Sequence, residues 1–511
     1  MSKVKKVALA IVVGVVLVIV ALAIFIPLLL NIDRYRPQVI AQIQQETGKP
    51  VQIGRLDLTI LPEVAIRVDD FSMGNPAGFP TGDFVKAKKI VAVVNASALM
   101  NHQVEITSLE LDDLTLNMLE DTHGKWNFEN PPAHDAGPPS AAGEKNSASF
   151  TLGVIAKVTI ARGQFSAASL LDSGVPGPSL VNVHGAAIDL RDVNLNAFAT
   201  TALLRDPASP PGTLARVTGW LNTTVYAADP AGPPVAQGRL KADSIEFGDL
   251  AVTKLKTNLR LYPKQVFADN LDLTCYGGSA TGNLSLNFGG ANLAYTVNAQ
   301  MKGVNVAGLL EAFPQAKGMM TGTLEGSAKL SGAVTHSTDP LVGITGSGQV
   351  AIRNGQMPSL QLTSNLRALA KLASVGPTNG DPSSFSSLST NFHIADARLT
   401  NDKISMVGNG VDVDGTGSMT MAGDGSLDYQ GDASLASSGT NPLATVLGGL
   451  AGAKFADGKM IFPFTVGGTF AKPKFSIKGA SGEAGAPKAA AEEPVKAVRG
   501  LAGLLRKQKQ Q

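Results

Sequence analysis

The sequence predicts a mainly β protein, in which one N-terminal transmembrane helix precedes an elongated, curled antiparallel β-sheet with a few short helices. Three observations support this fold class. Residues 7–30 form an uninterrupted apolar run, and apolar and polar residues alternate with a period of two through most of the chain that follows. Only 16% of the 511 residues are charged and 55 are glycine, a composition that favours short strands and turns.

The apolar run has the length of a membrane span. Its 24 residues are uncharged, and a helix of that size is about 36 Å long. A cleaved signal peptide is the alternative, because Ala21-Leu22-Ala23 resembles a cleavage site, but the run is too long for a simple signal-peptide core. We therefore expect an anchor at 7–30, with the lysine-rich residues 1–6 in the cytoplasm and the body of the chain outside it.

Beyond the anchor, residues 31–130 begin with a helix and continue as strands. The stretch 37–47 has helical character, with proline in its first turn and Gly48 as a C-terminal stop. From there the period changes to two, which is the pattern of strands that bury one face. The apolar positions of this pattern are Val51, Ile53, Leu56, Leu58, Ile60, Val64, Ile66 and Val68.

Composition divides the rest of the chain into three segments. Residues 131–149 are rich in Pro, Ala, Gly and Ser without periodicity, which predicts a flexible linker. Residues 150–478 predict a β-rich body, and residues 479–511 predict a low-complexity linker with a basic amphipathic tail. Helical spacing of apolar residues predicts three short helices in the body, at 306–313, 359–374 and 441–451.

The sequence carries no signature of a common catalytic or cofactor site. It has no phosphate-binding glycine-lysine loop, no Gly-x-Ser-x-Gly motif and no His-Glu-x-x-His motif, and its six histidines are dispersed. Cys275 is the only cysteine, which excludes intrachain disulfides and thiolate metal sites. We therefore expect no enzyme activity and assign no catalytic, cofactor-binding or metal-binding residue. The net charge of +2 provides no basic field for nucleic acid, which we do not expect as a partner.

Two local motifs have ordinary interpretations. Gly346-Ser347-Gly348 resembles part of a dinucleotide-binding fingerprint, but that motif opens a helix, whereas Val350 and Ile352 alternate as in a strand. The acidic pairs Asp69-Asp70 and Asp112-Asp113 lie next to expected strand ends, and we interpret them as solvated turns.

The apolar face of such strands has to be covered. The sequence predicts too few helices to do so. Either two sheets pack face to face as a sandwich, or one sheet curls and leaves an apolar groove of the kind that suits acyl chains. The candidate groove-lining residues are Leu259, Leu261, Leu271, Leu273, Leu284, Leu286 and Phe288.

Short motifs at both ends of the body point to a known family. The N-terminal ones are Asn31-Ile32-Asp33-Arg34-Tyr35-Arg36, Thr47-Gly48-Lys49-Pro50-Val51, Phe71-Ser72-Met73-Gly74-Asn75 and Phe84-Val85-Lys86-Ala87. The C-terminal ones are the stretches 346–355, 392–399 and 407–415, together with Phe462-Pro463-Phe464-Thr465-Val466-Gly467. As an ordered set, these motifs resemble the AsmA family.

The resemblance implies a protein of the bacterial inner membrane, with a single span, a cytoplasmic N-terminus and a periplasmic body. It implies a curled sheet whose apolar groove conducts phospholipids toward the outer membrane, and hence a part in outer-membrane biogenesis. The implied partners are phospholipid and the inner membrane, with no cofactor and no catalytic residue. The alternative is an assembly factor for outer-membrane proteins that acts by strand pairing or scaffolding, with outer-membrane assembly proteins as partners.

Overall fold

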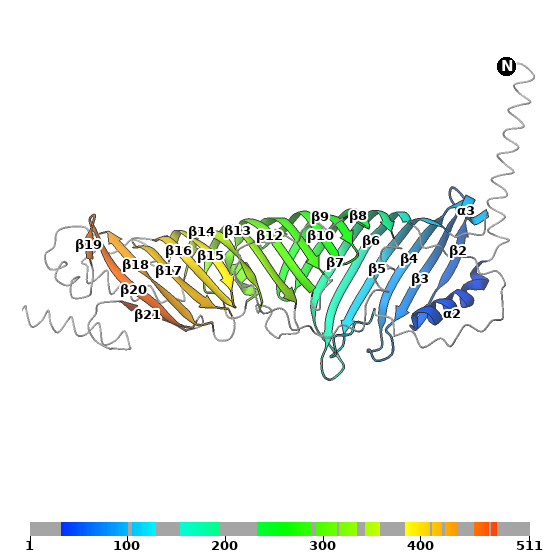
Figure 1. The fold of residues 1–511 in the computed structure, drawn as a ribbon, viewed down its shortest axis with the longest axis horizontal. Helices are drawn as coiled ribbons and strands as arrows, with labels where there is room; N and C mark the ends of the chain where they lie inside the picture. Colours follow the sequence, from blue (N-terminus) through cyan, green and yellow to red (C-terminus); the bar gives the residue numbers. More distant parts are fainter. Residues whose placement is uncertain are drawn as a thin grey trace, which may run out of the picture. The chain divides into compact units, whose positions relative to one another are not determined.

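The chain forms two compact units, Met1–Leu273 (unit 1) and Thr274–Gln511 (unit 2), which divide within strand β10 (Gln265–Cys275). Both consist mainly of strands (Figure 1). The structure is a computed structural model, and the residues it describes are 32–100, 105–128, 154–194, 232–287, 293–313, 316–334, 343–357, 384–408, 411–421, 425–436, 454–469 and 472–477.

Unit 1 is one sheet with short helices at its N-terminal edge. Strands β1 and β2 both pair with β3, and from β3 each strand pairs with the next as far as β10. Its elements are η1 (Ile32–Tyr35), α2 (Arg36–Thr47), β1 (Val51–Gln52), β2 (Arg55–Thr59), β3 (Ala65–Gly74), β4 (Asp83–Val94), α3 (Ala96–Met100), β5 (Ile106–Glu120), β6 (Val154–Leu170), β7 (Pro176–Asn194), β8 (Ala236–Phe247), β9 (Leu250–Tyr262) and most of β10.

One pair of strands in unit 1 departs from the expected antiparallel arrangement. Strands β5 and β6 run parallel, with Ser108 beside Lys157 and Glu120 beside Ser169. A parallel pair needs a connection that returns the chain to the same end of the sheet. Residues 121–153, which include the predicted linker, make that connection.

The N-terminal edge of unit 1 is occupied by the segment that precedes it. The Asp33 carboxylate accepts a 3.0 Å hydrogen bond from the Leu56 N–H on β2, and the Arg36 guanidinium donates to the Gly54 carbonyl. Helix α2 ends at Gly48, whose φ of 66° is the left-handed conformation expected of a C-cap glycine. These contacts occupy backbone groups that an edge strand would otherwise offer to another chain.

Unit 2 is an antiparallel meander. Each strand from β11 to β17 pairs with the next, β18 pairs with β20, and β20 also pairs with β19 and β21. Its elements are β11 (Gly278–Asn287), β12 (Leu293–Asn305), α5 (Val306–Glu311), β13 (Thr321–Val334), β14 (Thr345–Gln356), β15 (Ser384–Ala395), β16 (Arg398–Gly408), β17 (Val411–Thr420), β18 (Leu427–Ala436), β19 (Lys454–Ala456), β20 (Lys459–Thr469) and β21 (Lys472–Ile477).

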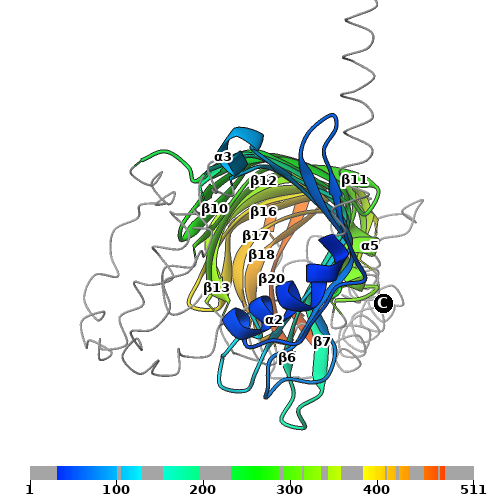
Figure 2. The ribbon, with the colours of Figure 1, turned by 90° about the vertical axis from the view of Figure 1, so that its right-hand side faces the viewer.

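A line of left-handed residues crosses the strands of unit 1 and bends them. Asp70, Asp113, Arg162, Lys254 and Asn270 have φ between 50° and 56°, each inside a strand. In sequence, all of them except Arg162 are the second of two polar residues between apolar ones, so the alternation changes phase there. At Asp70, Asp113 and Lys254 the pairing keeps the same register on both sides, so each strand bends there without an inserted residue. Bends that lie side by side curl the sheet (Figure 2).

The acidic pairs are therefore not turns, and that interpretation is wrong. Asp69-Asp70 lies within β3 and Asp112-Asp113 within β5. The prediction failed because acidic residues usually mark turns, whereas these pairs lie on the line of left-handed residues inside strands. There the Arg162 guanidinium contacts both Asp112 and Asp113.

Two predicted helices are confirmed. The stretch 37–47 is α2 and the stretch 306–313 contains α5, whose N-cap Asn305 side chain accepts from the Gly308 N–H at 2.8 Å. The predicted helices at 359–374 and 441–451, the linker 131–149, the tail 479–511 and the anchor 7–30 lie outside the described residues. Within the described ranges, no helix has the length and apolar character of a membrane span.

Candidate functional site

An apolar row crosses eight strands of unit 2 in register. Residues directly opposite each other in an antiparallel pair share one face of the sheet. Pairing places Leu284 of β11 opposite Val297 of β12 and continues in this way to Leu427 of β18. The members of this row are Leu284, Val297, Leu330, Gly346, Ile394, Leu399, Met419 and Leu427.

The neighbouring row, one residue away, is polar. It belongs to the opposite face, because successive residues of a strand point to opposite sides. Its members are Asn283, Asn298, Lys329, Ser347, His393, Thr400, Ser418 and Asp428. The sheet of unit 2 therefore has one apolar and one polar face.

A second row on the apolar face of unit 2 confirms the assignment. It starts at Leu324 of β13 and ends at Phe462 of β20. Its members are Leu324, Ile352, Leu388, Met406, Val413, Ala433 and Phe462.

Unit 1 repeats this one-sided pattern with more charge on the polar side. Its apolar row is Leu58, Ile66, Ala92, Leu109, Val158, Leu190, Gly238 and Leu259. The row one residue away is Asp57, Arg67, Val91, Glu110, Thr159, Asp189, Arg239 and Asn258. On that side Arg67 pairs with Asp69 at 2.8 Å and Arg239 lies 3.7 Å from Asp189.

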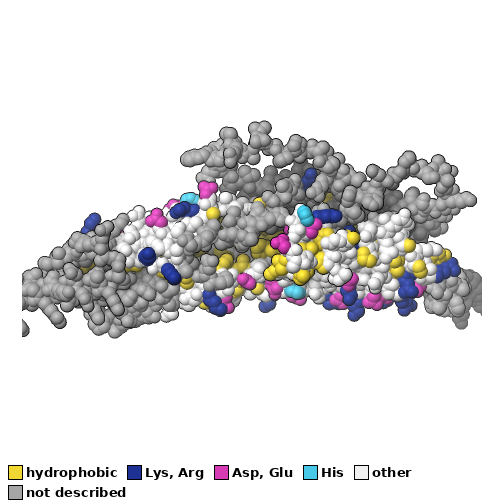
Figure 3. All heavy atoms as spheres, turned by 90° about the horizontal axis from the view of Figure 1, so that it is seen from below, with side chains coloured by type: hydrophobic (Ala, Val, Ile, Leu, Met, Phe, Trp, Pro, Cys, Tyr) yellow, Lys and Arg dark blue, Asp and Glu magenta, His cyan; other side chains and the backbone are white. Residues whose placement is uncertain are grey.

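The apolar face is only partly covered. In each unit the described strands form a single layer (Figures 1 and 2), and α2 and α5 contact strand neighbours at β1 and at β12 and β13. Leu284, Val297 and Leu330 of the first row are half-buried, where a sandwich core would bury them fully. The second row is mostly buried, with Phe462 1% exposed. In the space-filling view, hydrophobic side chains gather on the sheet, and most charged side chains lie along its border (Figure 3). The sheet arrangement is therefore the single curled one, and the sandwich alternative does not describe these units.

One polar cluster interrupts the apolar face of unit 2. Asn401, which is 6% exposed, donates to the Thr390 hydroxyl at 3.0 Å and accepts from the Tyr429 hydroxyl at 2.9 Å. Tyr429 reaches Asn401 across Gly417, the residue between them in register. Burial raises the pKa of Tyr429 to about 12, so this phenol is neutral near pH 7.

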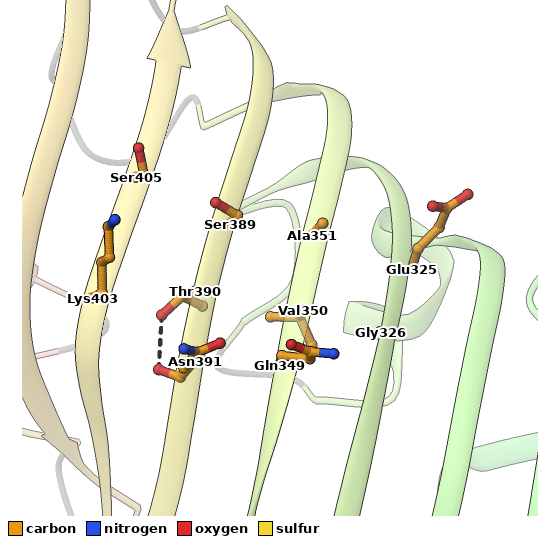
Figure 4. Close-up of a pocket in the computed structure, with 10 residues that line it drawn as sticks. All are labelled: Glu325, Gly326, Gln349, Val350, Ala351, Ser389, Thr390, Asn391, Lys403 and Ser405. Atoms are coloured by element: carbon orange, nitrogen blue, oxygen red, sulfur yellow. Dashed lines mark hydrogen bonds between the residues drawn. The ribbon is translucent and has the colours of Figure 1, made fainter.

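A hollow of about 530 Å³ lies on β13 to β16, and both polar side chains and the apolar Val350 and Ala351 line it (Figure 4). Gln349, Asn391 and Lys403 lie opposite one another in register, and they belong to the polar face. Glu325, Ser389 and Ser405 also line the hollow. The amides and charges in this lining make it a poorer site for an acyl chain than the apolar face, because covering them removes their water.

Most of the predicted groove-lining residues can be placed. Leu259 and Leu284 belong to the apolar rows, Leu286 lies opposite Tyr295 on the same face as Leu284, and half-buried Leu261 packs on the cluster of Ile155, Val193 and Ala236. Leu271 and Leu273 are half-buried on β10 and alternate with exposed Asp272, and Phe288 lies outside the described residues. That these residues line a lipid groove stays a prediction.

Sequence reasoning missed most of the apolar rows. Val297 belongs to them and lies in the regular alternation of β12, where it was overlooked. Leu399 and Met419 also belong to them, but a polar doublet interrupts the alternation of β16 and two glycines interrupt that of β17. The alternation changes phase at pairs of adjacent polar residues, such as Asp402-Lys403 between Asn401 and Ile404. Allowing for this change would have located the apolar residues on both sides of such a pair.

The described residues contain no group of three or more His, Cys, Asp or Glu side chains placed to hold a metal ion. Cys275 is buried, and burial raises the pKa of its thiol, which disfavours a reactive thiolate. The geometry instead defines a class of protein in which a single curled sheet offers one apolar and one polar face.

This chain is a member of the AsmA family. The family matches residues 1–168 and 216–404, which is most of the chain. No curated protein and no solved structure matches it.

Proposed function

We propose that this protein handles phospholipid in outer-membrane biogenesis by binding acyl chains on the apolar face of its sheet. The observation that carries the proposal is the pair of neighbouring rows in unit 2, one apolar and half-buried, the other polar. A chain of methylene groups laid on the apolar row leaves water at a gain of about 0.8 kcal/mol per methylene. Membership of the AsmA family supports the same function.

The geometry of a phospholipid fits a one-sided sheet. Acyl chains contact the apolar face, and the head group stays at the border, where charged side chains gather (Figure 3). The binding energy is non-directional, so a lipid can move along the face without losing a specific bond. Such a surface suits transfer better than tight storage.

The cellular setting belongs to the proposal. Residues 7–30 anchor the chain in the inner membrane, residues 1–6 lie in the cytoplasm, and the body lies in the periplasm. Phospholipid and the inner membrane are the partners, and the protein acts without a cofactor and without catalysis.

Strand pairing with client proteins is the alternative function. The contacts at the N-terminal edge of unit 1 disfavour strand pairing at that edge. The N–H of Leu56 on β2 is already held by Asp33, and the carbonyl of Gly54 by Arg36. A client strand would have to displace both contacts to add to this edge.

The experiment introduces a charge on one face at a time. The full chain is purified in an uncharged detergent, and the lipid that remains bound is quantified by mass spectrometry. Leu330→Glu places a carboxylate on the apolar face, and the adjacent Ser331→Glu places the same group on the polar face. We expect Leu330→Glu to lose most of the bound lipid and Ser331→Glu to keep it, with circular dichroism of both variants as the check on folding.

Equal lipid content in both variants would refute binding on the apolar face. Lipid absent from the unmodified protein, with outer-membrane proteins crosslinked to it in cells, would favour the assembly-factor alternative.

A further inference from the structure

The connection between α2 and β1 contains a buried lysine, Lys49, for which the described side chains provide no acidic partner. Lys49 is 4% exposed. Among the described residues its ammonium makes no hydrogen bond or ion pair, and its only close partner is the ring of Phe84, whose centroid lies 5.8 Å from Nζ. A buried ammonium is costly unless an opposite charge or several acceptors compensate for lost water.

The compensation within the chain is incomplete. A cation above an aromatic ring gains about 0.5–2 kcal/mol, and the C-terminal end of α2 adds a weak attraction. Burial, and then the charge of Lys125, lower the pKa of Lys49. Among the described residues, the charge that shifts the pKa of Lys49 is therefore that of a second cation, Lys125.

Hydrogen bonds hold this place rigidly. The Gly74 N–H donates to the Pro50 carbonyl at 2.7 Å, which fixes the α2–β1 connection on the end of β3. The Asn127 side chain is fully buried and donates to Asn75 Oδ1 and to the Asn117 carbonyl, both at 2.8 Å. These hydrogen bonds fix the backbone next to Lys49 and Lys125, at the ends of β3, β4 and β5.

The Asp121 carboxylate, four residues before Lys125, is engaged in its own turn. Asp121 accepts from the backbone N–H groups of His123 and Lys125, each at 2.8 Å. These bonds lower the pKa of Asp121, so it is ionised, but its oxygen is directed at the turn. The structure shows no bond from it to either ammonium.

Lys49 is not sealed from solvent. Among the described residues, Nζ of Lys49 has no hydrogen bond, yet it is not one of the fully buried side-chain atoms that lack a partner. Nζ is therefore not fully buried. The stem is covered while the ammonium retains some contact with water, which leaves an approach for a small anionic group.

We propose that Lys49 and Lys125 bind a phosphate group, either the phosphodiester of a phospholipid head group or free phosphate. The lipid form rests on the proposed function, and the site then holds the head group of a lipid at the α2 end of unit 1. An anion between two ammonium groups forms charge-assisted bonds, which are among the stronger hydrogen bonds in proteins.

The test uses the fluorescence of Trp126, which adjoins Lys125. The chain has two tryptophans, so Trp220→Phe leaves Trp126 as the single reporter. The full chain in a maltoside detergent is titrated with inorganic phosphate and, separately, with dihexanoyl phosphatidylglycerol, at constant ionic strength. We expect a saturable change whose dissociation constant rises about tenfold in Lys49→Met and in Lys125→Gln. Lys264→Gln, at an exposed turn between β9 and β10, removes the same charge and leaves the constant unchanged.

The two probes separate the sources of the anion. Tighter binding of the short-chain lipid than of phosphate identifies a head-group site, and equal binding identifies a site for free phosphate. No saturable change with either probe, or a change that persists in both lysine variants, overturns the proposal. Lys125 is exposed, so Lys125→Gln decides the matter even where Lys49→Met fails to fold.

The experiments distinguish a failure of the phosphate site from a failure of the proposed lipid function. If lipid remains on the apolar face, as mass spectrometry measures it, while neither probe responds to the lysines, the phosphate site alone is wrong. If phosphate binds through the lysines but no lipid is found, the lipid function is wrong and the site serves free phosphate.

Discussion

The two units build the same one-sided sheet by different means. Unit 1 bends its strands at a line of left-handed residues with charged neighbours, for example Arg162 between Asp112 and Asp113. Unit 2 places glycine on its apolar face beneath aromatic rings, as at Gly417 beside Tyr429 and Gly348 beside Phe392. The bend of unit 1 lies beside exposed charges, whereas the glycine positions of unit 2 rely on close packing.

The difference shows what the fold requires. Both units keep apolar residues in register across most of their strands, and neither repeats a fixed sequence motif. A sheet of this kind needs a bend and a one-sided pattern, and several local chemistries supply the bend. Substitutions should therefore cost more at the packed glycines of unit 2 than at the charges beside the bend of unit 1.

The largest effect is expected at Gly417. A Cβ there would lie 2.4 Å from Tyr429 Cδ1 and 2.5 Å from the Asp428 carbonyl oxygen, so the backbone would have to move. We expect Gly417→Ala to reduce the free energy of unfolding of unit 2 by about 3 kcal/mol. Gly467→Ala is the matched control, because the nearest atom to its Cβ would be 3.9 Å away. Hydrogen exchange of β17 and β18 measures both, and equal protection in the two variants would contradict the packing argument.

Alkaline pH should weaken unit 2 through Tyr429. Its folded-state pKa of about 12 lies above the ordinary value of 10.0, so between these values the unfolded chain loses the proton and the folded chain keeps it. This contribution to stability is complete below pH 10 and is lost as pH rises toward 12, on the order of 2 kcal/mol. Chemical denaturation between pH 9 and about 12 measures the loss. A Tyr429→Phe protein should lack this component, and an identical pH dependence in the two proteins would count against it.

At neutral pH, Tyr429→Phe should cost less. It removes the donor to Asn401 Oδ1 and leaves that buried oxygen without this 2.9 Å bond, for about 1–2 kcal/mol. Replacing both partners, as Tyr429→Phe with Asn401→Leu, should recover part of the loss, because no polar group is then left unpaired. If the double variant loses more stability than the two single variants together, the cluster contributes more than the mutual hydrogen bonding of its polar groups.

The smallest effect is expected at Arg162 in unit 1. Its side chain is 62% exposed, and its pairs with Asp112 and Asp113 are open to water and salt. Arg162→Gln should change the free energy of unfolding only slightly. The change should vanish in 1 M salt, because the Debye length falls to about 3 Å and the exposed charges are screened from each other. The pKa of Asp113, which the Arg162 guanidinium lowers, should rise toward its ordinary value, as a carboxyl NMR titration would show. A large loss that persists in high salt would mean that the bend in unit 1 depends on this charge.

Much of the fold was predictable, because period-two alternation reports directly on strands with one buried face. The helix before Gly48 and the strand that follows the Gly346-Ser347-Gly348 motif are both confirmed. The parallel pair β5–β6 was not predictable, since alternation carries no information on strand direction. The acidic pairs were misplaced because charge in a strand centre is uncommon unless the strand bends there.

The site was harder to predict than the fold. Which apolar residues share a face depends on register, and register depends on bulges such as the shift between Asn401 and Ile404. Lys49 belongs to the motif Thr47-Gly48-Lys49-Pro50-Val51 that supports the family resemblance, but its burial had no sequence signal, since burial without a partner is a property of the folded chain.

The most direct test of a lipid-binding face is photocrosslinking at matched neighbouring positions. A photoreactive amino acid is placed at Leu286 or Leu259 on the apolar face, and at the adjacent Ser285 or Asn258 on the polar face, in cells that express the full chain. We predict phospholipid adducts at Leu286 and Leu259 and none at Ser285 and Asn258. Adducts of equal yield on both faces, or protein adducts in place of lipid at Leu286 and Leu259, would contradict the account.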